Sequence, residues 1–80
     1  MGKSEALKEI NEIFINILDN KDLVITADTA AKDVEDWNSL THIELVVAIE
    51  KHFKIRFNLK EIQSWENVGQ MIDCILIKKA

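Results

Sequence analysis

The sequence predicts an all-α fold: a four-helix bundle of three longer helices and one short third helix, with a long loop between helices one and two. Apolar residues recur at helical spacing in three separate segments, and no internal repeat or strand pair is evident. With 80 residues, 48% of them hydrophobic, the chain can bury one small core. We therefore expect residues 1–80 to form a single domain.

The first helix is expected from Ser4 to about Asn20, with Ser4 as the N-cap and Glu5 in the positive first turn. Its apolar residues recur every three or four positions and are Leu7, Ile10, Ile13, Phe14, Ile17 and Leu18. Residues 20–37 lose this period and gather acidic and turn-forming side chains, which predicts a long loop typical of a functional connection. A short strand at residues 23–26 is the less favoured alternative, because no partner strand is visible.

A second helix is expected from Asn38 or Ser39 to about His52, because asparagine is a strong N-cap. Apolar residues cover much of its circumference, namely Leu40, Ile43, Val46, Val47, Ile49 and Phe53. The remaining polar stripe, on which we expect a partner to dock, consists of Thr41, Glu44, Ala48, Lys51 and His52.

The C-terminal third predicts one short helical turn at Leu59 and Ile62, before Ser64, and then a last helix. That helix is expected to start near Asn67, whose side chain caps it while Gln70 reaches back in a capping box. The residues of its buried face are Val68, Met71, Ile72, Ile75 and Leu76. Lys78 and Lys79 lie at its C-terminal end, where positive charge is favourable.

Charge and cysteine content exclude several classes of function. Ten Lys and Arg against fourteen Asp and Glu give a net charge of -4, the wrong sign for binding nucleic acid or an anionic membrane. Cys74 is the sole cysteine, so an internal disulfide and a cysteine metal cluster are excluded, and a reducing cytoplasm is favoured. The start lacks the apolar stretch of a signal peptide, and no segment approaches membrane-spanning length.

Catalytic and metal-binding candidates are weak. An enzyme would have to use Ser39, His42 and Glu44, but neither the strained glycine turn of a nucleophilic serine nor oxyanion donors are evident. His42 and His52 lack a ligand-spacing motif, and solvated histidines are the simpler interpretation.

Three other conspicuous side chains have simple structural interpretations. Trp37 and Trp65 each flank a helix start, where an aromatic ring commonly packs as a lid on the core. Cys74 is expected to act as a half-buried small hydrophobe. Ser39 differs because it begins a helix after a long loop, where a phosphate on its hydroxyl would be stabilised; an ordinary first-turn serine is the alternative.

Residues 37–53 resemble the second-helix signature of acyl carrier proteins. That family typically reads Asp-Ser-Leu, two variable residues, an aliphatic residue, Glu-Leu, an aliphatic run and a closing Phe, and this chain follows it from Ser39 to Phe53. Residues 53–57 resemble the turn into the short third helix of the family, and residues 68–75 resemble its fourth helix. The resemblance spans essentially the whole chain.

The resemblance implies a stand-alone carrier and not an enzyme. The matching serine, Ser39, would receive 4'-phosphopantetheine from coenzyme A through a phosphopantetheinyl transferase and become a phosphoprotein. The terminal thiol would hold acyl intermediates as thioesters and present them to acyl-loading and acyl-processing enzymes of fatty-acid, polyketide or related biosynthesis. The bundle interior near Val47, Ile62 and Ile72 is expected to shelter a short acyl chain. We expect a cytoplasmic monomer without nucleic-acid or membrane partners.

Three departures from the family pattern favour a specialised carrier over the housekeeping one of fatty-acid synthesis. Asn38 replaces the usual Asp, residues 35–37 lack the usual Gly, and Lys51 and its basic neighbours dilute the acidic stripe. The residues expected to dock partners are Asn38, Leu40, Thr41, Glu44, Val47, Ala48, Glu50 and Lys51. Two alternatives stay open: an aminoacyl or peptidyl carrier of a nonribosomal pathway, and an unmodified helical interaction module.

Overall fold

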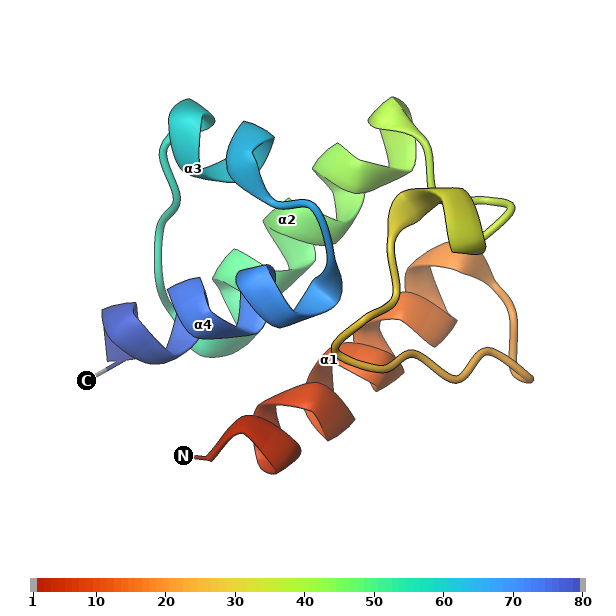
Figure 1. Ribbon diagram of the computed structural model, residues 1–80, viewed down its shortest axis with the longest axis horizontal. Helices are drawn as coiled ribbons and strands as arrows, with labels where there is room; N and C mark the ends of the chain where they lie inside the picture. The colour runs from red at the N-terminus through yellow and green to blue at the C-terminus, as the bar shows by residue number, and fades with distance from the viewer. Residues whose placement is uncertain (1, 80) are drawn as a thin grey trace.

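Residues 2–79 are described by a computed structural model, and they form four α-helices and one 3₁₀ turn (Figure 1). No strand occurs within these residues, so the predicted all-α fold with a short third helix is confirmed. No helix in this part of the chain combines the length and the apolar character needed to cross a membrane. The elements are α1 (Lys3–Leu18), η1 (Ala31–Asp33), α2 (Ser39–Phe53), α3 (Leu59–Ser64) and α4 (Val68–Lys79).

The start of α1 differs from the prediction. Gly2, in extended backbone without a side-chain hydrogen bond, occupies the N-cap position, so Ser4 lies inside the helix and its expected capping role is wrong. The helix ends at Leu18 because Asp19 adopts left-handed backbone, with φ 52°, and its amide donates to the carbonyl of Ile15.

The core lies where α1 packs against both α2 and α4. Phe14 of α1, Ile49 of α2 and Ile75 of α4 are fully buried, one from each long helix. Burial of such aliphatic and aromatic side chains is the main stabilising contribution in a domain of this size. The other buried apolar residues are Ala6, Ile10, Ile13, Leu18, Ile25, Val34, Trp37, Leu45, Val46, Phe53, Val68, Met71 and Ile72.

The long loop between α1 and α2 is bound to the helices along its length. Asn11 of α1 accepts the amide of Ile25 on its Oδ1 at 2.8 Å, and the side chain of Ile25 is buried. The amide of Gly69, at the start of α4, donates to the carbonyl of Ala27 at 2.8 Å. A Cβ at position 69 would lie 3.0 Å from that carbonyl oxygen, so the close approach favours glycine. The sequence predicted this loop but not its turn η1.

The predicted capping box of α4 forms only in part. The Oδ1 of Asn67 accepts the amide of Gln70 at 3.0 Å, as expected. The side chain of Gln70, however, accepts the amide of Glu66 at 2.9 Å instead of that of Asn67. Gln70 therefore accepts from the amide one residue before the one that a capping box requires.

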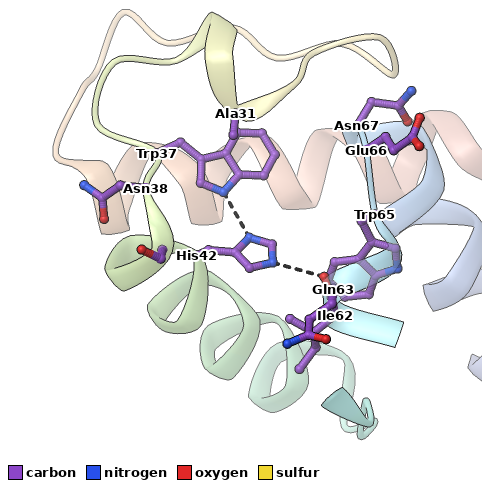
Figure 2. Close-up of a pocket in the computed structure, with 10 residues that line it drawn as sticks. Ala31, Trp37, Asn38, His42, Ile62, Gln63, Trp65, Glu66 and Asn67 are labelled. Carbon is purple, nitrogen blue, oxygen red and sulfur yellow. Dashed lines mark hydrogen bonds between the residues drawn. The ribbon is translucent and has the colours of Figure 1, made fainter. Parts of the chain in front are cut away.

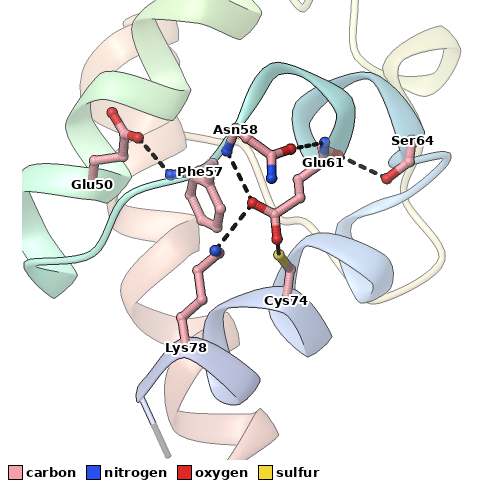
Figure 3. A network of polar contacts seen from close by, with 7 residues as sticks. All are labelled: Glu50, Phe57, Asn58, Glu61, Ser64, Cys74 and Lys78. Atoms are coloured by element: carbon pink, nitrogen blue, oxygen red, sulfur yellow. Dashed lines mark hydrogen bonds and ion pairs between the residues drawn. The ribbon is translucent and has the colours of Figure 1, made fainter.

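Helix α3 is joined to α4 by the carboxylate of Glu61 (Figure 3). It accepts the amide of Asn58 at 2.9 Å, pairs with the Nζ of Lys78 at 3.0 Å and accepts from the Sγ of Cys74 at 3.5 Å. The backbone hydrogen bond at Asn58, followed by the contact with Lys78, lowers the pKa of Glu61. Burial, and then the nearby Glu61 charge, raise the pKa of the Cys74 thiol. Cys74 is half-buried, as predicted.

Candidate functional site

Asn38 fixes the start of α2, as the sequence predicted. Its Oδ1 accepts the amides of Leu40 and Thr41 at 3.0 and 3.1 Å. The hydroxyl of Thr41 accepts the amide of Asn38 at 2.8 Å and donates to the carbonyl of Asp36 at 2.7 Å. These bonds form a capping box that ties the last residues of the loop to the first turn of the helix.

Ser39 is the first residue of α2, and its side chain is exposed. Within residues 2–79, its hydroxyl makes no hydrogen bond, so the oxygen is free for covalent modification. The first turn of α2 contains no acidic residue. A phosphate ester on this hydroxyl would therefore meet the positive end of the helix dipole without an opposing carboxylate in that turn.

Ser39 lines a cavity of about 350 Å³, and the labelled side chains of Figure 2 form the rest of its lining. The sequence did not predict it, because its walls come from η1, the start of α2, α3 and the connection to α4, and no spacing links those segments. Of the three residues expected to line an acyl shelter, only Ile62 lines it, so that grouping is wrong: Ile72 is buried in the core and Val47 is 43% exposed. The lining residues are Ala31, Trp37, Asn38, Ser39, His42, Ile62, Gln63, Trp65, Glu66 and Asn67.

A chain of two hydrogen bonds spans this cavity from the loop to α3 (Figure 2). The Nε1 of Trp37 donates to the Nδ1 of His42 at 3.0 Å. Because Nδ1 accepts, the neutral ring carries its proton on Nε2, which faces the carbonyl of Ile62 at 3.4 Å. His42 is therefore half-buried and bonded on both sides, and the expectation that it is solvated is wrong.

His52, the second histidine, is exposed, and its Nε2 lies 2.8 Å from a carboxylate oxygen of Glu9. The two histidines therefore belong to different neighbourhoods of α2. Among residues 2–79, no group of three or more His, Cys, Asp or Glu side chains has the arrangement of a metal site.

The two tryptophans pack as expected, but they also form walls of the cavity. Trp37 is buried and meets the ring of Phe14 edge-on, with 5.0 Å between centroids. Trp65 is half-buried and meets Phe57 edge-on at 4.8 Å. Each indole thus combines a packing role with an apolar surface close to Ser39.

The expected docking residues divide into two groups. Three of them are turned toward the protein itself and are half-buried. The hydroxyl of Thr41 is used in the cap, Ala48 packs against the core, and the carboxylate of Glu50 accepts the amide of Phe57 at 2.8 Å. The exposed members are Asn38, Leu40, Glu44, Val47 and Lys51.

Ile43, one of the apolar residues that cover much of the circumference of α2, lies on the exposed face. It is 50% exposed, and Leu40, on the same face, is 71% exposed. The spacing of apolar residues cannot separate these two from the buried Leu45 and Ile49, because apolar residues occur on nearly every side of α2.

Comparisons with known proteins identify the family. A family model described as a phosphopantetheine attachment site matches residues 8–75. The chain is also similar to the solution NMR structure of holo acyl carrier protein from Geobacter metallireducens, with 39% sequence identity and a TM-score of 0.85. That match covers 90% of this chain and 83% of the other. The chain belongs to the acyl carrier protein family.

Membership confirms the resemblance seen in the sequence and gives the cofactor. The cofactor of this acyl carrier protein is 4'-phosphopantetheine, attached covalently. Carrier proteins of this kind are typically non-catalytic, and they work with a phosphopantetheinyl transferase and with biosynthetic enzymes. The free hydroxyl at the first turn of α2 and the absence of acidic residues from that turn fit an attached phosphate.

Proposed function

We propose that Ser39 is the residue to which 4'-phosphopantetheine is attached. The observation that carries this proposal is the exposed, unbonded hydroxyl of Ser39 at the start of α2, within the part of the chain that the structure describes. The phosphopantetheine arm supplies a thiol on which acyl groups are held as thioesters. Ser39 holds the arm, Asn38 fixes the helix turn that presents it, and the neighbouring cavity offers the arm an apolar surface.

The chain itself catalyses no reaction in this proposal. A nucleophilic serine needs a base, and His42, the nearest histidine along α2, has both ring nitrogens engaged by Trp37 and Ile62. Ser39 therefore has no activated oxygen of its own, and its modification depends on the transferase that uses coenzyme A.

The pathway is proposed to be a specialised one, with its own acyl-loading and acyl-processing enzymes. The exposed face of α2 carries Glu44 but also Lys51, so it is less acidic than the stripe typical of fatty-acid carriers. A single domain over residues 1–80, a monomeric state and a cytoplasmic location stay predictions of the same proposal.

The mass of the intact protein tests the attachment residue directly. After incubation with coenzyme A and a broad-specificity phosphopantetheinyl transferase, the wild type should gain one phosphopantetheine group. Ser39→Ala should gain none, because the ester oxygen is removed. Ser4→Ala and Ser64→Ala remove the other two serines of the chain and should be modified like the wild type.

Three other outcomes would contradict the proposal. Modification of Ser39→Ala would place the group elsewhere, and failure of the wild type with several transferases would favour an unmodified interaction module. Loading of an amino acid onto the arm by an adenylating enzyme would replace the acyl carrier by an aminoacyl carrier.

A further inference from the structure

The C-terminal end of α2 carries a group of unpaired cations around a groove. Lys51, Lys54 and Arg56 are exposed, and none of them takes part in an ion pair within residues 2–79. They line a groove of about 410 Å³ together with the apolar side chains of Val47 and Ile55. We call this feature the basic groove.

Glu50 is the one carboxylate among the described residues that line the basic groove, and it is hydrogen-bonded to the backbone. Glu50 accepts the amide of Phe57 through its Oε2 at 2.8 Å and is half-buried (Figure 3). This hydrogen bond ties the carboxylate to the chain that follows α2, and Glu50 forms no ion pair with the three exposed cations within residues 2–79. The lining of the basic groove therefore combines two apolar side chains with three exposed cations.

The opposite end of α2 has the opposite charge. Glu35 and Asp36 are exposed just before the helix start that carries Ser39. From Ser39 to Lys54 the helix rises about 22 Å, at 1.5 Å per residue. A surface that docks along α2 thus meets acidic groups near Ser39 and basic groups about 20 Å away, which is between about two and three Debye lengths at physiological salt.

We infer that the basic groove docks an acidic, partly apolar segment of an enzyme that acts on the arm. Carboxylates of that segment face Lys51, Lys54 and Arg56, and one apolar side chain lies between Val47 and Ile55. The identification of the partner as such an enzyme rests on the proposed function. Docking of the acidic segment at the other end of α2 would place it against Glu35 and Asp36, so the charge pattern favours the basic groove. A uniformly anionic surface, such as a membrane or RNA, is repelled by the acidic end.

A pair of synthetic peptides tests this inference on the full chain. One is a short amphipathic helix of leucine and glutamate, and the other has lysine in place of every glutamate. The acidic peptide should produce saturable NMR shifts at the amides of Val47, Lys51 and Ile55. The basic peptide should leave these amides unchanged.

Charge reversal at the basic groove supplies the matched comparison. In the triple variant Lys51→Glu, Lys54→Glu and Arg56→Glu, the affinity for the acidic peptide should fall by at least about tenfold, since three exposed ion pairs are lost. The control variant Lys8→Glu, Lys21→Glu and Lys32→Glu changes the net charge equally at exposed lysines outside the basic groove, and it should keep its affinity for the peptide.

Four results would overturn the inference: equal binding of both peptides, shifts outside the basic groove, equal loss in the control variant, or stronger shifts with phosphatidylserine vesicles or duplex RNA. The mass of each sample after transferase treatment is measured in parallel. If Ser39 is not modified but the acidic peptide still binds, only the proposed function is rejected. If Ser39 is modified but the acidic peptide does not bind, only the docking inference is rejected.

Discussion

Two helix starts in this protein use the same cap and have different surroundings. Both α2 and α3 begin after an asparagine, Asn38 and Asn58, and both caps are completed by the side chain three residues later. At α3 that residue is Glu61, which also reaches Lys78 and Cys74 of α4. At α2 it is Thr41, whose hydroxyl reaches only the adjoining loop.

The difference shows how one local motif serves two purposes. The cap sets where each helix begins, but the longer side chain of Glu61 ties α3 to a neighbouring helix. The buried Trp37 supports the start of α2, because it packs on Phe14 of α1 and donates a hydrogen bond to His42 of α2. Ser39 and Leu40 lie on the surface. This arrangement suits the proposed role of Ser39, because an attachment residue must be fixed in position and yet reached by several enzymes.

The largest effect is expected from removing the support behind α2. Trp37→Ala deletes a buried indole that packs on Phe14, and it should lower the free energy of unfolding by about 3 to 5 kcal/mol. Trp65→Ala removes a half-buried indole and should cost less. Urea unfolding of both variants measures the difference, and equal losses would show that Trp37 is not the main anchor.

A smaller effect is expected from the caps themselves. Asn38→Ala should cost about 1 kcal/mol of unfolding free energy, and more than Asn58→Ala. The reason is that Asn38 accepts two backbone amides, whereas Asn58 accepts one. Asn38→Asp keeps the acceptor and adds a charge that suits the helix start, so it should retain stability. An aspartate as destabilising as alanine in urea unfolding would refute this account of the cap.

The smallest effect is expected at the tie between α3 and α4, and it depends on pH. Because the pKa of Glu61 lies below its usual 4.5, its carboxylate stabilises the fold above that value and loses this contribution as the pH falls through the lowered pKa. The stability difference between wild type and Glu61→Gln should therefore shrink in acid. Unfolding curves at several pH values measure it, with Glu66→Gln as the exposed control. A difference that stays constant with pH would contradict the tie.

The sequence predicted the helices better than it predicted their surroundings. Caps and apolar spacing are local, so they located α2 and the short α3 to within a residue or two. The environment of His42 depends on Trp37 and on the carbonyl of Ile62, twenty residues further along the chain, and no local pattern encodes such a contact. The exposed side of α2 was also ambiguous, because Ile43 and Ile49 fit a helical period equally well.

Locating the modification by peptide mapping tests the central claim most directly. The protein is produced together with a phosphopantetheinyl transferase and digested with trypsin, and the fragments are sequenced by mass spectrometry. Residues 33–51 form one tryptic peptide whose sole serine is Ser39. We predict that this peptide carries the phosphopantetheine group and that its fragment ions assign the group to Ser39. A modified peptide containing Ser4 or Ser64 instead would contradict the account.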